Sequence, residues 1–137
     1  MTQTTSPAGA APEPISRAAR VTGRILSGLA VLFLTFDAGI KLLRLPVAVD
    51  GTTQLGYPAA VVLPIGLIAT VLLILYVIPR TAVLGAILWT GYLGGAIATH
   101  VRLGNPLLTH VLFPIYVAVF IWAGLWLRDQ RVRALLR

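Results

Sequence analysis

The stretch that decides the fold is residues 59–99, which read AAVVLPIGLIATVLLILYVI, then PR, then TAVLGAILWTGYLGGAIAT. Residues 59–78 and residues 81–99 each reach the roughly 20 apolar residues that a helix needs to cross a bilayer core. Only Pro79 and Arg80 separate the two segments, so the helices must be antiparallel neighbours. The stretch therefore predicts a transmembrane helical hairpin.

Two further segments of membrane length, residues 25–43 and 107–127, lie on either side of this hairpin. The 137-residue chain is 58% hydrophobic and 11% charged, with a mean hydropathy of +0.90, whereas soluble domains are about a quarter charged. We predict one all-α domain, an integral membrane four-helix bundle over residues 23–128. A disordered N-terminal tail, residues 1–22, and a basic tail, residues 129–137, are expected to flank it.

Basic residues divide unevenly between the two predicted faces of the membrane. One face would hold eight of them (Arg17, Arg20, Arg24, Arg80, Arg128, Arg131, Arg133 and Arg137), and the other would hold Lys41, Arg44 and Arg102. By the positive-inside rule, both termini are expected in the cytoplasm and the longer loops outside. The net charge of +7 is thus explained by membrane topology, and no nucleic-acid partner is predicted.

The absence of cysteine from the sequence limits the chemistry that the chain can perform alone. Disulfides, thiolate zinc sites and iron–sulfur clusters are excluded, so a redox role would need a bound organic cofactor or a partner subunit. His100 and His110 fall in different segments with no third ligand at a suitable spacing. We therefore predict no metal site.

Asp37 and Lys41 lie four residues apart inside the first apolar segment. Residues at this spacing share one helix face, and an acid placed before a base is the favourable order. Charge within a bilayer is costly, so an intramembrane carboxylate is a functional-site hypothesis by default. The pair has two interpretations that the sequence leaves open: a neutralised pair that orients the first helix, or part of a ligand site.

Other polar residues are predicted in the same outer half of the membrane. The third segment runs outward and ends at His100 and Arg102, while the outer loop, residues 46–58, contains a turn signal at Asp50-Gly51 and is expected to fold over the outer mouth. Tyr57 in that loop suits an interfacial depth. The candidate ligand-binding residues are thus Asp37, Lys41, His100, Arg102 and Tyr57, and no catalytic residue set is recognisable.

Small residues and prolines give further structural expectations. Gly91 and Gly95 form a small-xxx-small pair that we expect to serve packing inside the bundle, with homodimerisation as the alternative. Pro64 and Pro114 fall early in helices that enter from outside. Each either kinks its helix, which frees a carbonyl four residues earlier, or occupies the first turn of a helix that starts later.

Five motifs occur in an order that resembles the DoxX-like family of small bacterial membrane proteins. They are GRILSGL (23–29), FDAGIKL (36–42), LGYP (55–58), IPRTAVLGA (78–86) and GGAIATHVR (94–102). The resemblance implies a four-helix protein of the bacterial inner membrane. Founding members of the family are described as small subunits of a thiosulfate:quinone oxidoreductase, so it also implies a quinone or head-group site at Asp37, Lys41, His100 and Arg102.

These observations lead to one principal functional hypothesis and two alternatives. The principal one is an accessory membrane subunit whose outer-facing polar pocket contacts quinone or lipid and supports a redox partner protein. It would be at most a subunit of a quinone-linked oxidoreductase, and homo-oligomers are compatible with it. The alternatives are a small proton-coupled transporter, against which Lys41 argues because it competes with a cationic substrate, and a purely structural scaffold.

Overall fold

The computed structural model describes residues 13–135, and this part of the chain is helical with short connections. The α-helices are α1 (Arg17–Leu42), α2 (Pro46–Gln54), α3 (Val62–Val77), α4 (Ala82–Arg102), α5 (Phe113–Arg128) and α6 (Gln130–Leu135). A 3₁₀ turn, Ala59–Val61, precedes α3, and a π turn, Leu107–Val111, precedes α5. Four segments are long and apolar enough to cross a membrane: Arg17–Leu42, Ala59–Val77, Ala82–Arg102 and Leu107–Arg128. The predicted all-α bundle with four membrane-spanning helices is confirmed.

The outward surface of the long helices is made of large apolar side chains. Leu32 is 70% exposed and Phe36 is 64% exposed, and similar residues follow along α3 and α5. An apolar surface of this extent is unfavourable in water and is solvated by lipid chains in a bilayer. The chain is therefore a multi-pass membrane protein.

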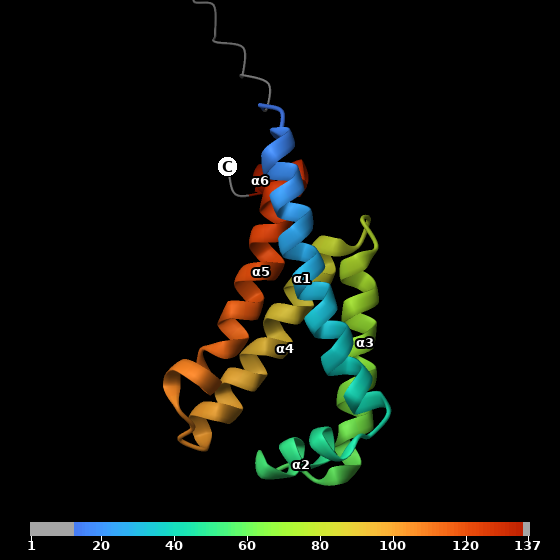
Figure 1. The fold of residues 1–137 in the computed structure, drawn as a ribbon, viewed down its shortest axis with the longest axis vertical. Coiled ribbons are helices and arrows are strands. Elements are labelled where there is room, and N and C mark those ends of the chain that lie inside the picture. Colours follow the sequence, from blue (N-terminus) through green and yellow to red (C-terminus); the bar gives the residue numbers. More distant parts are fainter. Residues whose placement is uncertain (1–12, 136–137) are drawn as a thin grey trace, which may run out of the picture.

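The four long helices meet closely at one end and diverge toward the other (Figure 1). At the terminal end, which holds Arg17 and Arg128, α1 lies against α5. At the opposite end, called here the α2 end, α1 and α5 separate and α2 lies across the opening (Figure 1). Helix α1 also contacts α3, while α4 contacts both α3 and α5.

Helices α3 and α4 form the predicted hairpin, with their backbones in direct contact at Gly85. A Cβ atom at this position would come within 2.6 Å of Tyr76 Cα and 2.8 Å of the Leu75 carbonyl carbon. Only glycine permits such an approach. The hydroxyl of Thr81 donates a hydrogen bond of 2.8 Å to Leu75 O, which satisfies a carbonyl at the end of α3.

The core lies between α1, α3, α4 and α5, where Leu34, Tyr76, Trp89, Ile121 and Leu125 are each less than 2% exposed. The Tyr76 hydroxyl lies 3.1 Å from both Ser27 Oγ and Ile121 O. A buried hydroxyl needs such partners because bulk solvent cannot reach it. This one side chain therefore connects α3 to α1 and to α5.

Helix α1 begins earlier than the sequence predicted. Ser16 caps it, since its Oγ accepts a hydrogen bond of 3.2 Å from Ala19 N, and serine is a favourable N-cap. Residues 17–22, which we expected in a disordered tail, are thus part of the helix. The prediction for residues 1–12 lies outside the described part of the chain.

The predicted basic tail also contains structure, because residues 130–135 form α6. Asp129 Oδ1 accepts a hydrogen bond of 2.9 Å from Arg131 N at the start of this helix. Val132 is 1% exposed and belongs to the main core, and Arg131 Nη2 donates to Pro79 O in the α3–α4 turn. Helix α6 therefore folds back onto the terminal end of the bundle.

Asp50-Gly51 does not form the predicted turn but lies inside α2. Pro46 is in the first turn of this helix, where its missing N–H costs nothing. The chain reverses instead at Arg44, with a φ of 50°, and at Gly56, with a φ of 84°. Ala48 and Thr52 fix the helix against the bundle because they are its two buried residues.

Pro64 and Pro114 do not kink their helices but lie in the first turn of helices that start later, which was the second of the two expectations. Pro64 is the third residue of α3 and Pro114 is the second residue of α5. Both therefore occupy the first turn of a helix that starts late, where proline is tolerated. The chain before Pro114 forms the π turn, and the chain before Pro64 forms the 3₁₀ turn.

Candidate functional site

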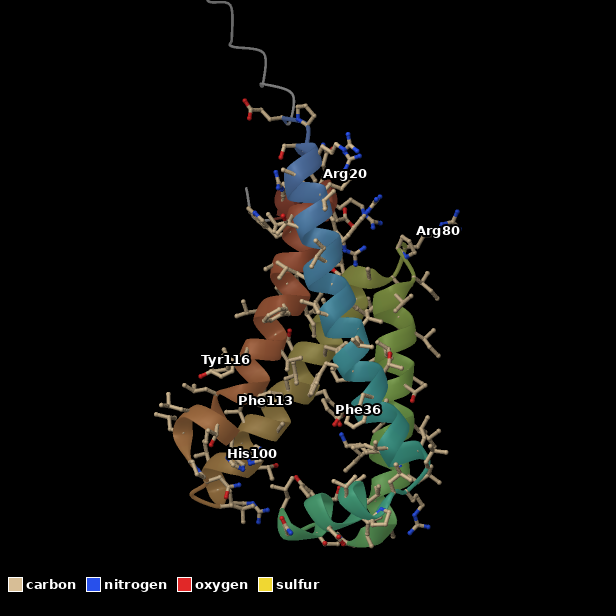
Figure 2. All side chains as sticks on the ribbon, in the orientation of Figure 1. Arg20, Phe36, Arg80, His100, Phe113 and Tyr116 are labelled. Atoms are coloured by element: carbon tan, nitrogen blue, oxygen red, sulfur yellow. The ribbon has the colours of Figure 1, made fainter. Side chains whose placement is uncertain are left out.

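A cavity of about 390 Å³ lies at the α2 end, where the long helices diverge. Side chains from α1, α4 and α5 form most of its walls, α2 and α3 contribute Thr52 and Ile65, and the α2–α3 connection contributes Leu55 and Tyr57. A second hollow of about 380 Å³ extends it under α2 toward the loop before α5 and shares Asp37, Lys41 and His100 with it. Figure 2 labels His100 at this end of α4, far from Arg20 and Arg80 at the terminal end.

Asp37 and Lys41 face this cavity as an ion pair. Lys41 Nζ donates to Asp37 Oδ2 across one turn of α1, as the spacing predicts. Their side chains are only partly exposed, 26% for Asp37 and 16% for Lys41. The pair thus carries no net charge, yet the ammonium group keeps two further N–H donors.

His100 presents its ring to the same cavity from α4. Asn105 Nδ2 lies 2.8 Å from His100 Nδ1, and because an amide nitrogen only donates, Nδ1 is the acceptor and the neutral ring carries its proton on Nε2. The His110 ring packs edge-on at a centroid distance of 5.6 Å. The two histidines therefore come together, although no group of three His, Cys, Asp or Glu side chains forms within residues 13–135.

Tyr57 and Arg102 connect the α2–α3 loop to α4. The Tyr57 hydroxyl lies 2.9 Å from Thr99 Oγ1, which itself donates to Gly95 O at 2.9 Å, so Tyr57 is the donor of this pair. Arg102 Nη2 donates to Leu55 O at 2.9 Å. Of the five candidate residues, Asp37, Lys41, Tyr57 and His100 line the cavity, whereas Arg102 is not among its lining residues.

Tyr92 lines the cavity, although the sequence analysis did not select it. It lies on α4 with its ring edge-on to Trp89 at a centroid distance of 5.0 Å. Tyr92, Ala96 and Thr99 follow the i, i+4, i+7 spacing of one helix face. This spacing, whose last member Thr99 directly precedes His100, could have identified Tyr92 from the sequence.

Gly91 and Gly95 of α4 do not serve the packing that we expected. A Cβ atom at Gly91 or at Gly95 would meet nothing within 4 Å, so neither glycine is needed for close contact inside the bundle. Gly95 instead lines the cavity. The physical reason is that α4 diverges from α3 toward the α2 end (Figure 1), which leaves open space beside these glycines.

Comparison with known proteins assigns the chain to a family. The model of the DoxX-like family matches residues 25–124, which include α3, α4 and most of α1 and α5. No curated protein and no solved structure gave a match. The matched region contains every residue of the cavity wall described above. The chain belongs to the DoxX-like family.

Proposed function

We propose that this protein binds the polar head of a membrane-soluble amphiphile, a quinone or a lipid, in the cavity at the α2 end. In this proposal it serves as an accessory subunit of a redox partner in the bacterial inner membrane. The observation that carries the proposal is the convergence of Lys41, His100 and Tyr92, three hydrogen-bond donors from two helices, on one cavity of about 390 Å³. A volume of this size is typical of small-molecule sites.

The charge of the cavity favours a neutral head with oxygen acceptors. Because Asp37 already neutralises Lys41, the site offers neither an unpaired cation for an anionic head nor an unpaired carboxylate for a cationic one. It still offers the remaining Lys41 donors and the Nε2 proton of His100. Carbonyl oxygens, such as those of a quinone ring, accept such bonds.

The lack of cysteine in the sequence supports the accessory role in this proposal. A chain without cysteine cannot hold an iron–sulfur cluster or a reactive dithiol. Electrons would therefore reach a quinone in this cavity from a partner protein, and the present chain would bind and orient the ring.

The proposed topology places the cavity on the outer side of the membrane. Arg17, Arg80 and Arg131 lie at the terminal end, since α6 contacts the α3–α4 turn there, and other arginines accompany them. Fewer basic residues lie at the α2 end. The positive-inside rule then supports cytoplasmic termini.

A purely structural role is the second candidate, and one observation favours it. A Cβ atom at Gly66 of α3 would come within 2.9 Å of Lys41 Cβ, so the ion pair sits at a tight contact between α1 and α3. A pair in this position could fix the rotation of α1 without any ligand. By contrast, the direct pairing counts against a proton-coupled transporter, because a cationic substrate would have to displace Lys41.

Extraction from native membrane tests the proposal. The protein is isolated with its surrounding lipid by an amphipathic polymer, extracted with organic solvent and analysed by mass spectrometry. We expect one neutral amphiphile to be enriched over the bulk membrane, and its enrichment to fall in Lys41→Met and Tyr92→Phe. Asp50→Asn, an exposed residue of α2 that does not line the cavity, is the matched control. An extract with the composition of the bulk membrane for every variant would refute the proposal.

A further inference from the structure

The cavity continues sideways into an apolar groove on the lipid-facing surface. The groove has a volume of about 320 Å³ and lies between α1 and α5. It is lined by Leu29, Ala30, Phe33, Phe113, Tyr116, Val117 and Phe120. Tyr116 is the only lining residue with a polar side-chain atom, and its hydroxyl donates to Leu108 O at 3.3 Å. The groove therefore offers a surface for hydrocarbon and almost nothing for a polar group.

The cavity and the groove share part of their walls. Phe33, Phe113 and Val117 line both, so the two hollows adjoin at these side chains. The rings of Phe33 and Phe113 meet edge-on, with centroids 5.3 Å apart. This aromatic pair lies between the polar site and the surrounding lipid.

The divergence of the helices creates this opening. At the terminal end, a Cβ atom at Gly23 of α1 would come within 2.9 Å of Gly124 O on α5, so the two helices touch there. Toward the α2 end they separate (Figure 1), and Figure 2 labels Phe113 and Tyr116 in the part of α5 near that end. Near the α2 end the rings of Phe33 and Phe113 bridge α1 and α5, whereas at the terminal end the backbones of the two helices are in contact.

We infer that the hydrocarbon chain of the bound amphiphile lies in the α1–α5 groove, and that its head reaches the cavity past Phe33 and Phe113. This inference rests on the proposed function, because it assumes a head in the cavity. It adds the class of ligand, a molecule with a compact head and at least one long hydrocarbon chain. It also assigns the route of entry, which runs sideways from the bilayer and not from water through α2.

Dimensions and chemistry agree with a chain in this position. The groove follows α5 from Phe113 to Phe120, a rise of about 10 Å. Hydrocarbon gains little by leaving lipid for another apolar surface. The hydrocarbon chain of the ligand therefore adds little affinity of its own, and it lies in the groove mainly because the bound head holds it there. In this position the chain orients the head toward the cavity side of Phe33.

Two leucines of α1 provide a matched pair of variants. Leu29 lines the groove, whereas Leu32 is 70% exposed and lines neither hollow. Leu29→Trp puts a large ring into the groove, and Leu32→Trp puts the same ring into open lipid. Both are outside the cavity, so neither removes a donor from the polar site.

Competition binding with two probes tests the inference. The probes are a benzoquinone with a long alkyl chain and the same ring without it, each measured in one detergent so that partition into micelles cancels between variants. We expect Leu29→Trp to weaken the long-chain probe roughly tenfold, because the new ring and the alkyl chain compete for the same space and overpacking is costly. Binding of the chainless ring, and of both probes to Leu32→Trp, should stay unchanged.

A photoreactive probe locates the chain without any substitution. A diazirine on the alkyl chain should label residues 29–33 and 113–120, and excess chainless ring should abolish this labelling. The same experiment with a lysophospholipid probe distinguishes a lipid head from a quinone head. If that probe alone labels the groove, the result supports the groove and the route of entry and overturns a quinone as the ligand.

The outcomes separate this inference from the proposed function. If the chainless ring binds the wild type while Leu29→Trp has no effect and chain labelling is spread over all helices, the groove assignment is overturned and the cavity site stands. If no probe binds and labelling is never displaced by a head group, both proposals fall.

Discussion

Removing either member of the Asp37–Lys41 pair should destabilise the protein, and removing both should restore part of the loss. The variants are Asp37→Asn, Lys41→Met and the double substitution. Breaking a fully buried pair costs about 3–5 kcal/mol, whereas exposed pairs contribute roughly 0.2–1 kcal/mol. Side chains that are 26% and 16% exposed lie between these limits.

The two single substitutions should differ in their cost to stability, because the charge that each leaves unpaired differs in its access to the membrane interface. Lys41 is one residue from the end of α1 at Leu42, and without Asp37 its long side chain can extend to the interface. Asp37 lies about 6 Å deeper along the helix than Lys41, and its side chain is short. We therefore expect a cost of about 2 kcal/mol for Lys41→Met and about 1 kcal/mol for Asp37→Asn, below the roughly 3 kcal/mol of a charge at the bilayer centre.

The double variant should cost about 1 kcal/mol, less than Lys41→Met alone, because no charge is stranded. The implied coupling of about 2 kcal/mol is within the range for residues in direct contact. Unfolding by denaturing detergent, followed through the fluorescence of the buried Trp89, gives all three values. Asp50→Asn, at an exposed position of α2, is the control and should change stability by less than about 0.5 kcal/mol. Additive effects of the two single substitutions would refute this reasoning.

Three further predictions concern the fold and the terminal end. Gly85→Ala should cost about 2 kcal/mol or more, because the new methyl group meets the Tyr76 backbone, whereas Gly91→Ala in the same helix meets nothing and should be neutral or slightly stabilising; equal detergent midpoints for the two would contradict this. Tyr57→Phe should cost about 1 kcal/mol through the lost hydrogen bond to α4, and amide exchange should rise in α2 but not in α5. Arg131 lowers the pKa of Asp129 below its ordinary 3.8, chiefly through a side-chain hydrogen bond, so the stabilisation from this pair is complete above pH 3.8 and is lost as the pH falls through the lowered pKa. The difference in thermal midpoint between wild type and Asp129→Asn should therefore be constant near neutral pH and shrink only in that acidic range.

Hydrophobic segment length predicted the membrane fold because the bilayer constrains it strongly. Any chain with four apolar runs of this length, two of them separated by Pro79 and Arg80, has few alternatives to a helical bundle. Prediction from local sequence was less reliable for the connections outside the membrane-spanning segments. The turn tendency of Asp50-Gly51 was overridden because the N-terminal Pro46 and the buried contacts of α2 favour a helix, and short-range composition cannot report such contacts.

The candidate site was only partly predictable for a related reason. Charged residues inside an apolar segment can be selected from the sequence alone, as Asp37 and Lys41 were. Tyr92 did not, because a tyrosine in a membrane helix is ordinarily an apolar packing residue, and only the divergence of α1 from α4 turns its face into a cavity wall. The role of Arg102 depended on where the Leu55 carbonyl lies, which is a tertiary contact of residues 47 positions apart.

The central claim is that the cavity at the α2 end holds the polar head of an amphiphile, and a structure in native lipid tests it most directly. The account predicts density in that cavity, with an oxygen atom within hydrogen-bond distance of Lys41 Nζ or His100 Nε2. Density for a hydrocarbon chain should continue past Phe33 into the α1–α5 groove. A well-ordered cavity that contains only water, or side chains collapsed into its space, would contradict the account.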